Sequence, residues 1–328
     1  MDVGQYNEHD QVIWDEELSD FVPDRVFDAH IHLFNSAHYP PGNAAWSDQG
    51  LADIQQWAET LYPGRRTHFL ALGSPLIGID VAAHNAWLIS EIQQDANSRL
   101  NRLVTPACTP DEISRDVEQA GVVGLKPYRI FALNGDAKEC SIEQFLTHEQ
   151  LEVADHYGLW VTMHLSKELA CADPTNLADL REYTTSRYPN VKWILAHCAR
   201  SFTYWPIRQA VSQLRDMPNI YYDLSAVDDL RPILTLFQQE SLDRILYGSD
   251  GVDATYFRGK YVALGRAWQY LDAAEAGMRF PHCDARPILS VYEQLLCMKH
   301  AAEIAEFGQP EIDAIFWKNA TELFNVTW

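Results

Sequence analysis

The stretch RVFDAHIHLF, residues 25–34, combines an apolar run with two histidines that are one residue apart. Successive side chains of a β-strand point to opposite faces, so a strand here would present His30 and His32 on the same side. The pair could bind a metal ion, or it could be two polar residues on the solvent-exposed face of an ordinary strand. Whether other strands supply further metal-binding side chains decides between these interpretations.

Seven further apolar runs follow, at residues 68–76, 102–108, 121–130, 159–166, 192–200, 219–227 and 244–252. Their nearly continuous apolar character is typical of parallel strands that are buried on both faces. The segments between them favour helices, at residues 51–62, 84–100, 110–121, 142–158, 176–188 and 230–240. Gly121 stands where it would end one of these helices. Eight strands that alternate with helices predict an α/β fold, a (β/α)8 TIM barrel, with an open sheet of nine or ten strands as the alternative.

The last quarter of the chain favours helices only, at residues 264–277, 287–308 and 310–326. We expect one domain over residues 1–328, with the barrel at about 25–255 and a helical extension at about 256–328 that packs on it. The long C-terminal helices could also pair with a second subunit, which would make a homo-oligomer.

The chain of 328 residues carries 46 acidic against 25 basic side chains, a net charge of −21. Such a surface repels nucleic acid and anionic membranes, but a local pocket can still bind an anionic small-molecule substrate. The N-terminus has no signal-peptide pattern, no apolar run reaches the roughly 18 residues of a membrane span, and the six cysteines form no CxxC pair. These features predict a cytoplasmic protein with reduced thiols.

Ionisable residues gather at the ends of five of the eight predicted strands: His30 and His32, Lys126, His164, His197, and Asp250. A barrel brings the C-terminal ends of its strands to one rim, where catalytic residues lie. Each residue alone has an ordinary explanation, such as a hydrogen-bonded histidine, a surface lysine or a turn aspartate. Their common position at the C-terminal ends of the strands favours a metal centre, because imidazole nitrogen and carboxylate oxygen are the ligands that Zn²⁺ and similar ions prefer.

These motifs together resemble the amidohydrolase superfamily, and its amidohydrolase-related (amidohydrolase 2) branch in particular. That branch includes hydrolases, lactonases and nonoxidative decarboxylases of aromatic or unsaturated acids. Three further stretches are similar to it: GVVGLKPY (121–128), ILYGSDG (245–251) and FWKNATELF (316–324). The resemblance covers residues 25 to 325, although the HxH motif by itself would be weak.

The resemblance implies a set of metal ligands: His30, His32, His164 and Asp250. In members with one metal, the residue at the place of His197 often lies outside the ligand set. In members with two metals, the lysine at the place of Lys126 is carboxylated and bridges them. We expect one divalent ion, with Zn²⁺ preferred over Mn²⁺ and Fe²⁺, or two if Lys126 is carboxylated.

A hydrolase is the expected activity, with Asp250 and His197 as catalytic residues. Asp250 would take a proton from water that attacks an amide, ester or lactone carbonyl, and His197 would stabilise the oxyanion. Four residues beyond strand ends could bind a substrate carboxylate: Lys126, Tyr128, Arg129 and Arg200. Trp46, in the loop after the first strand, could add an apolar wall. The alternatives are a nonoxidative decarboxylase (a lyase) and a barrel that has lost catalysis and serves as a scaffold.

Overall fold

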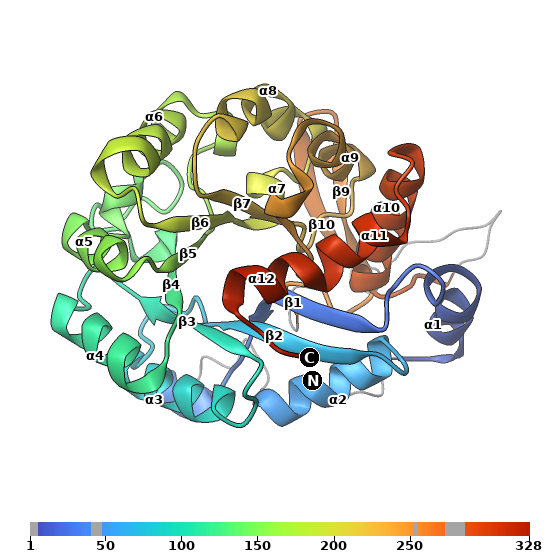
Figure 1. Ribbon diagram of the computed structural model, residues 1–328, viewed down its shortest axis with the longest axis horizontal. Coiled ribbons are helices and arrows are strands. Elements are labelled where there is room, and N and C mark those ends of the chain that lie inside the picture. The colour runs from blue at the N-terminus through green and yellow to red at the C-terminus, as the bar shows by residue number, and fades with distance from the viewer. Residues whose placement is uncertain (1–5, 41–47, 252–254, 273–285) are drawn as a thin grey trace.

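The computed structural model describes residues 6–40, 48–251, 255–272 and 286–328. Eight parallel strands follow one another in chain order, and helices surround them (Figure 1). The strands are β1 (Arg25–His32), β2 (Arg66–Leu72), β3 (Arg99–Val104), β4 (Gly124–Pro127), β5 (Trp160–Met163), β6 (Lys192–Leu195), β7 (Ile220–Asp223) and β8 (Ile245–Leu246). The predicted TIM barrel is confirmed, and all eight predicted strands are present.

The backbone between β8 and β1 closes the barrel at its upper rim. The amide of Asp250 donates to the carbonyl of His30 at 2.8 Å, and the amide of His32 donates to the carbonyl of Gly251 at 2.8 Å. One carboxylate oxygen of Asp28 accepts from the amides of His30 (3.1 Å) and Ser249 (2.9 Å). This seam places the ends of the first and last strands beside each other.

The helices that surround the barrel are α1 (Glu8–Ile13), α2 (Leu51–Leu61), α3 (Val81–Ile92), α4 (Pro110–Ala120), α5 (His148–Tyr157), α6 (Pro174–Glu182), α8 (Tyr204–Arg215) and α9 (Leu230–Gln239). Gly121 ends α4 in the left-handed conformation, with φ 69°, as predicted. The prediction of a helix to residue 100 is wrong, because the chain turns after Ile92 and β3 begins at Arg99. Helices α1 and α8 were not predicted.

The predicted sixth strand, residues 192–200, extends too far. Strand β6 ends at Leu195, and residues His197 to Arg200 all have φ between 50° and 60°. This left-handed turn is costly for residues with a Cβ, so surrounding contacts must hold it in place. It directs the side chains that follow β6 over the mouth of the barrel.

Helix α12 (Asn319–Phe324) plugs the end of the barrel at which the strands begin (Figure 1). The ring of Phe324 lies 5.5 Å from that of Phe27 and 4.8 Å from that of Trp160. The side-chain amide of Asn319 donates to the carbonyls of Leu242 (2.8 Å) and Ile245 (2.9 Å). The FWKNATELF segment therefore seals the end opposite to the mouth.

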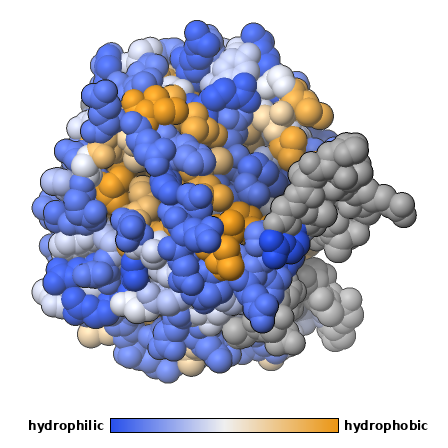
Figure 2. Space-filling view, turned by 90° about the vertical axis from the view of Figure 1, so that its right-hand side faces the viewer, coloured by the Kyte–Doolittle hydropathy of each residue, from blue (hydrophilic) through white to orange (hydrophobic). Residues whose placement is uncertain are grey.

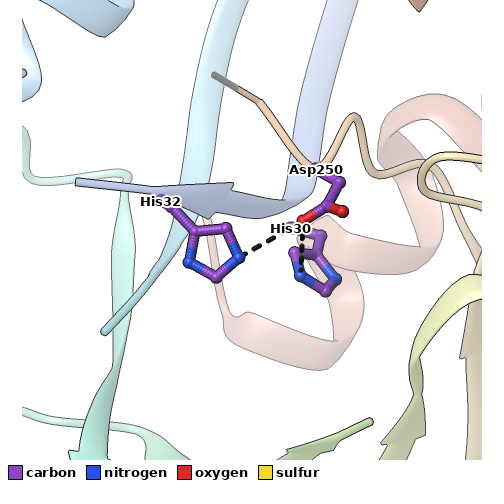
Figure 3. Close-up of side chains that lie close together, drawn as sticks. All are labelled: His30, His32 and Asp250. Carbon is purple, nitrogen blue, oxygen red and sulfur yellow. Dashed lines mark ion pairs between the residues drawn. The ribbon is translucent and has the colours of Figure 1, made fainter. Parts of the chain in front are cut away.

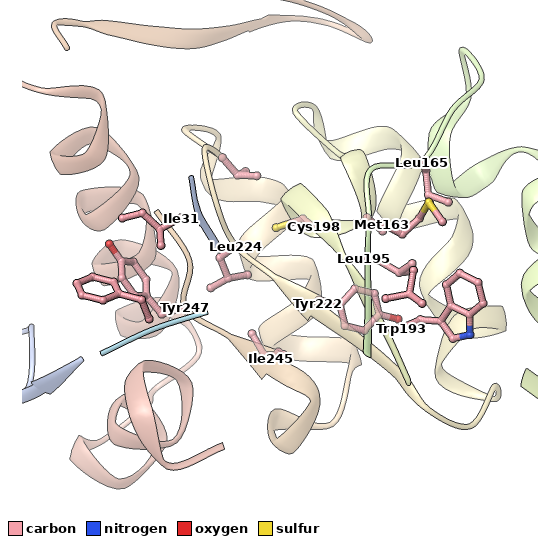
Figure 4. Close-up of a cluster of buried hydrophobic side chains, with 14 of the residues drawn as sticks. Ile31, Met163, Leu165, Trp193, Leu195, Cys198, Tyr222, Leu224, Ile245 and Tyr247 are labelled. Carbon is pink, nitrogen blue, oxygen red and sulfur yellow. The ribbon is translucent and has the colours of Figure 1, made fainter. Parts of the chain in front are cut away.

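A layer of apolar side chains fills the space between the strands and the surrounding helices (Figure 4). Its members point outward from the barrel, and they include Ile31, Met163, Trp193, Leu195, Tyr222, Ile245 and Tyr247. Helices α10 (Ser290–Ile304) and α11 (Gln309–Asp313) complete this layer near β1 and β8. Apolar side chains thus fill the end of the barrel at which the strands begin and the space outside the strands. The polar residues gather at the other end, the mouth, where the strands end.

The predicted helix at residues 264–277 is wrong over its described part, and residues 273–277 lie outside the described residues. Strands β9 (Gly259–Leu264) and β10 (Ala267–Asp272) form an antiparallel hairpin there. Gly265 at the turn has φ 68°, a conformation that glycine adopts without strain. The alternating aromatic residues of the two strands explain the preference for a hairpin.

The hairpin is joined to the end of α10 by a buried carboxylate, that of Asp228. One oxygen of Asp228 accepts from the amide of Tyr261 at 2.8 Å and from the hydroxyl of Ser290 at 3.2 Å. The other oxygen is buried without a hydrogen-bond partner. Burial, with a smaller contribution from Glu293, raises the pKa of Asp228 to about 7, although Lys260 and these hydrogen bonds oppose the shift.

The surface seen in Figure 2 is mostly hydrophilic, with apolar side chains in small groups. The most exposed large apolar residues are Ile77, Leu133 and Leu264, which lie in separate parts of the chain. Within the described residues, no helix combines the length and the apolarity needed to cross a membrane.

Substitution Asp228→Asn should make the stability of the protein less dependent on pH. The folded state keeps the Asp228 proton up to about pH 7, whereas the unfolded chain releases it near pH 3.8. Wild-type stability should therefore fall as pH rises through this window, by up to about 4 kcal/mol from this group. Urea unfolding at pH 5 and pH 8 measures the difference. An equal pH dependence in both proteins would contradict the assignment.

Candidate active site

Three side chains converge at the mouth of the barrel: His30 and His32 from β1, and Asp250 from the segment after β8 (Figure 3). The Nε2 atoms of both histidines lie 3.2 Å from the same oxygen of Asp250. One ligand atom from each residue lies within 4.8 Å of the others. Within the described part of the chain, this is the one group of three or more such residues that could hold a metal ion.

An irregularity in β1 turns the two histidines toward the interior. Asp28 pairs with Phe69 of β2, but Ile31 pairs with Ala71, so β1 contains one extra residue between these positions. Because strand side chains alternate, such a bulge reverses which residues face inward. Below it Phe27 belongs to the apolar interior of the barrel, and above it Ile31 belongs to the outer layer. His30 and His32 therefore face the mouth.

Asp223, the last residue of β7, fixes both His30 and the backbone of His197. One of its oxygens lies 2.9 Å from Nδ1 of His30. The other accepts from the amides of His197 (3.0 Å) and Ser225 (3.1 Å). Burial favours the neutral acid, but the His30 ring and these donors hold the pKa of Asp223 below its usual range. The ionised carboxylate thus orients a candidate ligand on β1 from β7, two strands away around the barrel.

His197 and His164 lie next to the three converging residues. The ring of His197 is 5.1 Å from that of His30 and 5.1 Å from that of His164. His164 does not join the group of His30, His32 and Asp250 as the side chains stand. The structure thus brings together three of the four predicted ligands and places the fourth beside the predicted catalytic histidine.

All four histidines have an oxygen beside Nδ1. Nδ1 of His30 lies 2.9 Å from a carboxylate oxygen of Asp223, and Nδ1 of His197 lies 2.9 Å from the Ser225 carbonyl. Nδ1 of His32 lies 3.4 Å from the Tyr128 hydroxyl, and Nδ1 of His164 lies 3.2 Å from the Leu165 carbonyl. For His30 and His197 the close oxygen at Nδ1 favours a proton there, which leaves a lone pair on Nε2 of a neutral ring. In His32 the nearer oxygen is that of Asp250, 3.2 Å from Nε2, so a cation held between them would replace the proton at that nitrogen.

The protonation states suit the binding of a divalent cation. Burial lowers the pKa of His32 to about 4, and it also lowers the pKa values of His164 and His197. Burial favours neutral Asp250, but His30 and His197 hold the pKa of its carboxyl well below the usual range. Burial and Lys126 lower the pKa of His30, but Asp223 and Asp250 outweigh them, so its pKa is raised. Metal ligands must be neutral imidazole and ionised carboxylate, so these residues fit a divalent ion that displaces a proton from His30.

The oxyanion-stabilising role that the sequence predicts for His197 depends on which ring nitrogen carries its proton. A neutral ring with its proton on Nδ1 can accept a hydrogen bond or bind a cation through Nε2, but it cannot donate from that atom. The Ser225 hydroxyl also lies 3.0 Å from Nδ1 and strengthens this orientation. His197 is therefore better placed as a ligand or proton acceptor.

Lys126 and Tyr128, two of the predicted substrate-binding residues, are both buried. The Lys126 ammonium lies 3.5 Å from Nε2 of His30. Burial lowers the pKa of Lys126 to about 8, although Asp223 and Asp250 oppose the shift. The Tyr128 hydroxyl donates to the carbonyl of Gly73 at 2.6 Å, so it orients His32 more than it offers a free donor to a substrate.

Arg129 and Arg200 place two further cations near His164. Burial lowers the pKa of Arg200 to about 10, and Arg129 adds to the shift. Both arginines also contribute to the lowered pKa of His164, after burial and His197. Arg129 donates to the carbonyl of Ala137 and Arg200 to that of Lys167, and neither forms an ion pair within the described residues. Nε of Arg200 is buried without a partner.

The sequence interpretation missed Asp223 as a site residue. It ends the seventh predicted strand in the run IYYD (220–223), so the search for ionisable groups at strand ends could have found it. The predicted apolar wall at Trp46 lies outside the described residues.

Comparison with known proteins identifies relatives at the level of family and fold. A family model described as amidohydrolase matches residues 27–326. No curated protein matches the sequence. A probable 2-pyrone-4,6-dicarboxylic acid hydrolase from Acinetobacter baumannii, solved with citric acid bound, has a similar structure. The TM-score is 0.57 at 15% identity, over 92% of this chain and 99% of that one.

Two decarboxylases of solved structure are also similar. The 5-carboxyvanillate decarboxylase from Sphingomonas paucimobilis has a TM-score of 0.52 at 12% identity, over 93% of this chain and 100% of that one. The enzyme of the same name from Novosphingobium aromaticivorans, solved with manganese and a nitrobenzoic acid, has a TM-score of 0.54 at 13% identity, over 94% and 97%. Identities this low show the shared fold alone. Since the family model spans almost the whole barrel and the helices that follow it, the chain belongs to the amidohydrolase family of metal-dependent enzymes.

Proposed function

We propose that the protein is a hydrolase that uses one divalent metal ion, Zn²⁺ in the first instance, to activate water against the carbonyl of a small carboxylate-bearing substrate. The observation that carries the proposal is the convergence of the Nε2 atoms of His30 and His32 on one carboxylate oxygen of Asp250. His30, His32 and Asp250 would hold the ion, with His164 completing the set as the sequence predicted. Mn²⁺, present in one similar structure, is the alternative metal.

A bound ion supplies Lewis acidity, which polarises a carbonyl and makes water a nucleophile near neutral pH. Asp250 takes the proton that the water loses as its oxygen forms a bond to the carbonyl carbon, and it returns that proton to the leaving atom as the old bond breaks. His197 offers a second proton acceptor through Nε2. The Lys126 ammonium, 3.5 Å from His30, stabilises the negative charge that develops on the carbonyl oxygen.

The cations on the side of β4 to β6 support a substrate with a carboxylate. Lys126, Arg129 and Arg200 come from the ends of β4 and β6, and the buried Nε of Arg200 lacks a partner. A planar guanidinium can bind a carboxylate through two parallel hydrogen bonds. This local positive charge stands against the net charge of −21 of the whole chain.

Nonoxidative decarboxylation of an aromatic or unsaturated acid is the second candidate. Two similar structures are 5-carboxyvanillate decarboxylases, and the same ligand set and cations would hold an acid. In that reaction the carbon–carboxylate bond breaks and its electron pair stays on the carbon as CO₂ leaves. Asp250 or His197, after first taking up a proton from water or from a substrate hydroxyl, gives that proton to the carbon.

Substitution His30→Ala should abolish metal binding, because it removes a buried lone pair from the converging group. We expect at least about 100-fold weaker binding, more than the roughly 10–100-fold typical for loss of an outer partner of a ligand. Metal content after dialysis and the affinity for Zn²⁺ measure the effect. The matched control is His156→Ala at an exposed histidine of α5. Unchanged metal content in His30→Ala would refute the assignment.

The two candidate reactions differ in their products, so a substrate panel separates them. The metal-loaded protein is incubated with 2-pyrone-4,6-dicarboxylate, simple lactones, 5-carboxyvanillate, 2,6-dihydroxybenzoate and salicylate. We expect ring opening of a carboxylate-bearing lactone without CO₂ release. CO₂ release from an aromatic acid would instead favour the decarboxylase, and turnover of neutral lactones alone would contradict the carboxylate requirement.

Substitution Arg200→Ala should weaken substrate binding more than it slows the reaction. A hydrogen bond to a charged group contributes about 1.5–3 kcal/mol, so KM should rise roughly 10- to 100-fold. Steady-state kinetics with the best substrate of the panel measures the change, and Arg208→Ala, an exposed arginine of α8, is the control. A fall in kcat with constant KM would show that Arg200 acts differently.

A further inference from the structure

The β9–β10 hairpin presents an aromatic face. Tyr261 lies directly opposite Tyr270, and Ala263 lies opposite Trp268. Residues that are opposite each other in an antiparallel pair, and those two positions along a strand, share a face. Tyr261, Trp268 and Tyr270 are therefore on one side of the hairpin, and the exposed Leu264 belongs to the other side.

This aromatic face packs on the active site through Phe202. The ring of Phe202 stacks at 4.8 Å on Tyr261 and lies 4.4 Å from Trp268. On its other side it stacks on His197 at 5.3 Å. The hairpin thus lies over the β6 side of the mouth, next to the candidate catalytic histidine.

Contacts at both ends hold the hairpin in this position beside α10 (Figure 1). At its base, Asp228 accepts from the amide of Tyr261 at 2.8 Å, and Lys260 pairs with Glu293 at 2.5 Å. At its turn, the guanidinium of Arg266 lies 4.4 Å from the ring centre of Trp205 on α8. The backbone of Tyr261 is therefore fixed relative to the barrel.

The hydroxyl of Tyr261 has no hydrogen-bond partner among the described residues, although the ring is largely enclosed. The ring that carries this hydroxyl stacks on Phe202, and Phe202 in turn stacks on His197 of the candidate active site. Burial raises the pKa of the phenol, with a further contribution from Asp250, so the hydroxyl keeps its proton. A fixed hydroxyl donor without a partner among the described residues suits an oxygen atom of a bound molecule.

We propose that Tyr261 is a substrate-binding residue, whose hydroxyl donates a hydrogen bond to a carboxylate or carbonyl oxygen of the molecule bound beside Asp250. The inference rests on the proposed function. The aromatic residues Phe202 and Trp268 act as positioning residues. Phe202 stacks on both Tyr261 and His197, and Trp268 packs on Phe202 and on Tyr261. Tyr261 lies over the β6 side of the mouth through Phe202 and His197, and Arg200 also follows β6, so the phenol and this guanidinium could bind the same molecule.

Substitution Tyr261→Phe tests the proposal, since it removes the donor and keeps the ring. We expect KM for the best substrate, and the dissociation constant of salicylate measured by calorimetry on the metal-loaded full chain, to rise about 10-fold or more. Metal content, Tm and kcat should stay close to wild type. Tyr270→Phe is the matched control, because it removes a hydroxyl from the opposite position on the same face and should change neither constant.

The outcomes separate the inference from the proposed function. If wild type turns over or binds an acid and Tyr261→Phe matches it in both constants, the role of Tyr261 is refuted while the proposed function stands. If wild type binds and converts none of the panel, both are refuted. A lower Tm with equal losses in kcat and affinity would show a structural role only. Trp268→Phe should keep wild-type constants, whereas Trp268→Ala should raise KM as Tyr261→Phe does.

Discussion

The carboxylate of Asp223 connects three strands of the site. It bonds the side chain of His30 on β1, the amide of His197 after β6, and the amide of Ser225 after β7. A buried carboxylate is costly unless it is well hydrogen-bonded, and here its partners are the groups that the site must hold still. The same bond fixes the tautomer of His30, and so decides which nitrogen faces the mouth.

Irregular backbone is concentrated at the mouth of the barrel, and regular packing at its floor. The bulge in β1 turns His30 and His32 inward, and the left-handed turn at residues 197–200 follows β6. Asp250 also has a positive φ, of 59°. Such conformations persist only where neighbouring contacts hold them. Here Asp28 accepts hydrogen bonds from the amides of His30 and Ser249, and Asp223 accepts from those of His197 and Ser225. At the other end of the barrel, Asn325 after Phe324 also has a positive φ, of 52°, but there it ends helix α12 as a left-handed cap, which asparagine adopts readily.

The charge on one side of the mouth of the barrel differs in sign from the net charge of the chain. The chain carries a net charge of −21, yet Lys126, Arg129 and Arg200 lie together on one side of the mouth. The hairpin of β9 and β10 lies over the His197 side with an aromatic face and a phenol. The site therefore combines a cluster of candidate metal ligands, a cationic side and an aromatic side, each from a different part of the barrel.

The sequence by itself determined the barrel, because eight apolar runs separated by helical segments leave few other arrangements. It also predicted which rim carries the candidate site, since His30 and His32 lie at the end of β1, and His197 and Asp250 follow β6 and β8. Only the tertiary structure decided that His30, His32 and Asp250 converge while His164 lies beside His197. It alone decided the bulge, the pairing of His30 with Asp223 across 193 residues, and the hairpin where a helix was expected. These features depend on contacts between distant residues, which local periodicity does not encode.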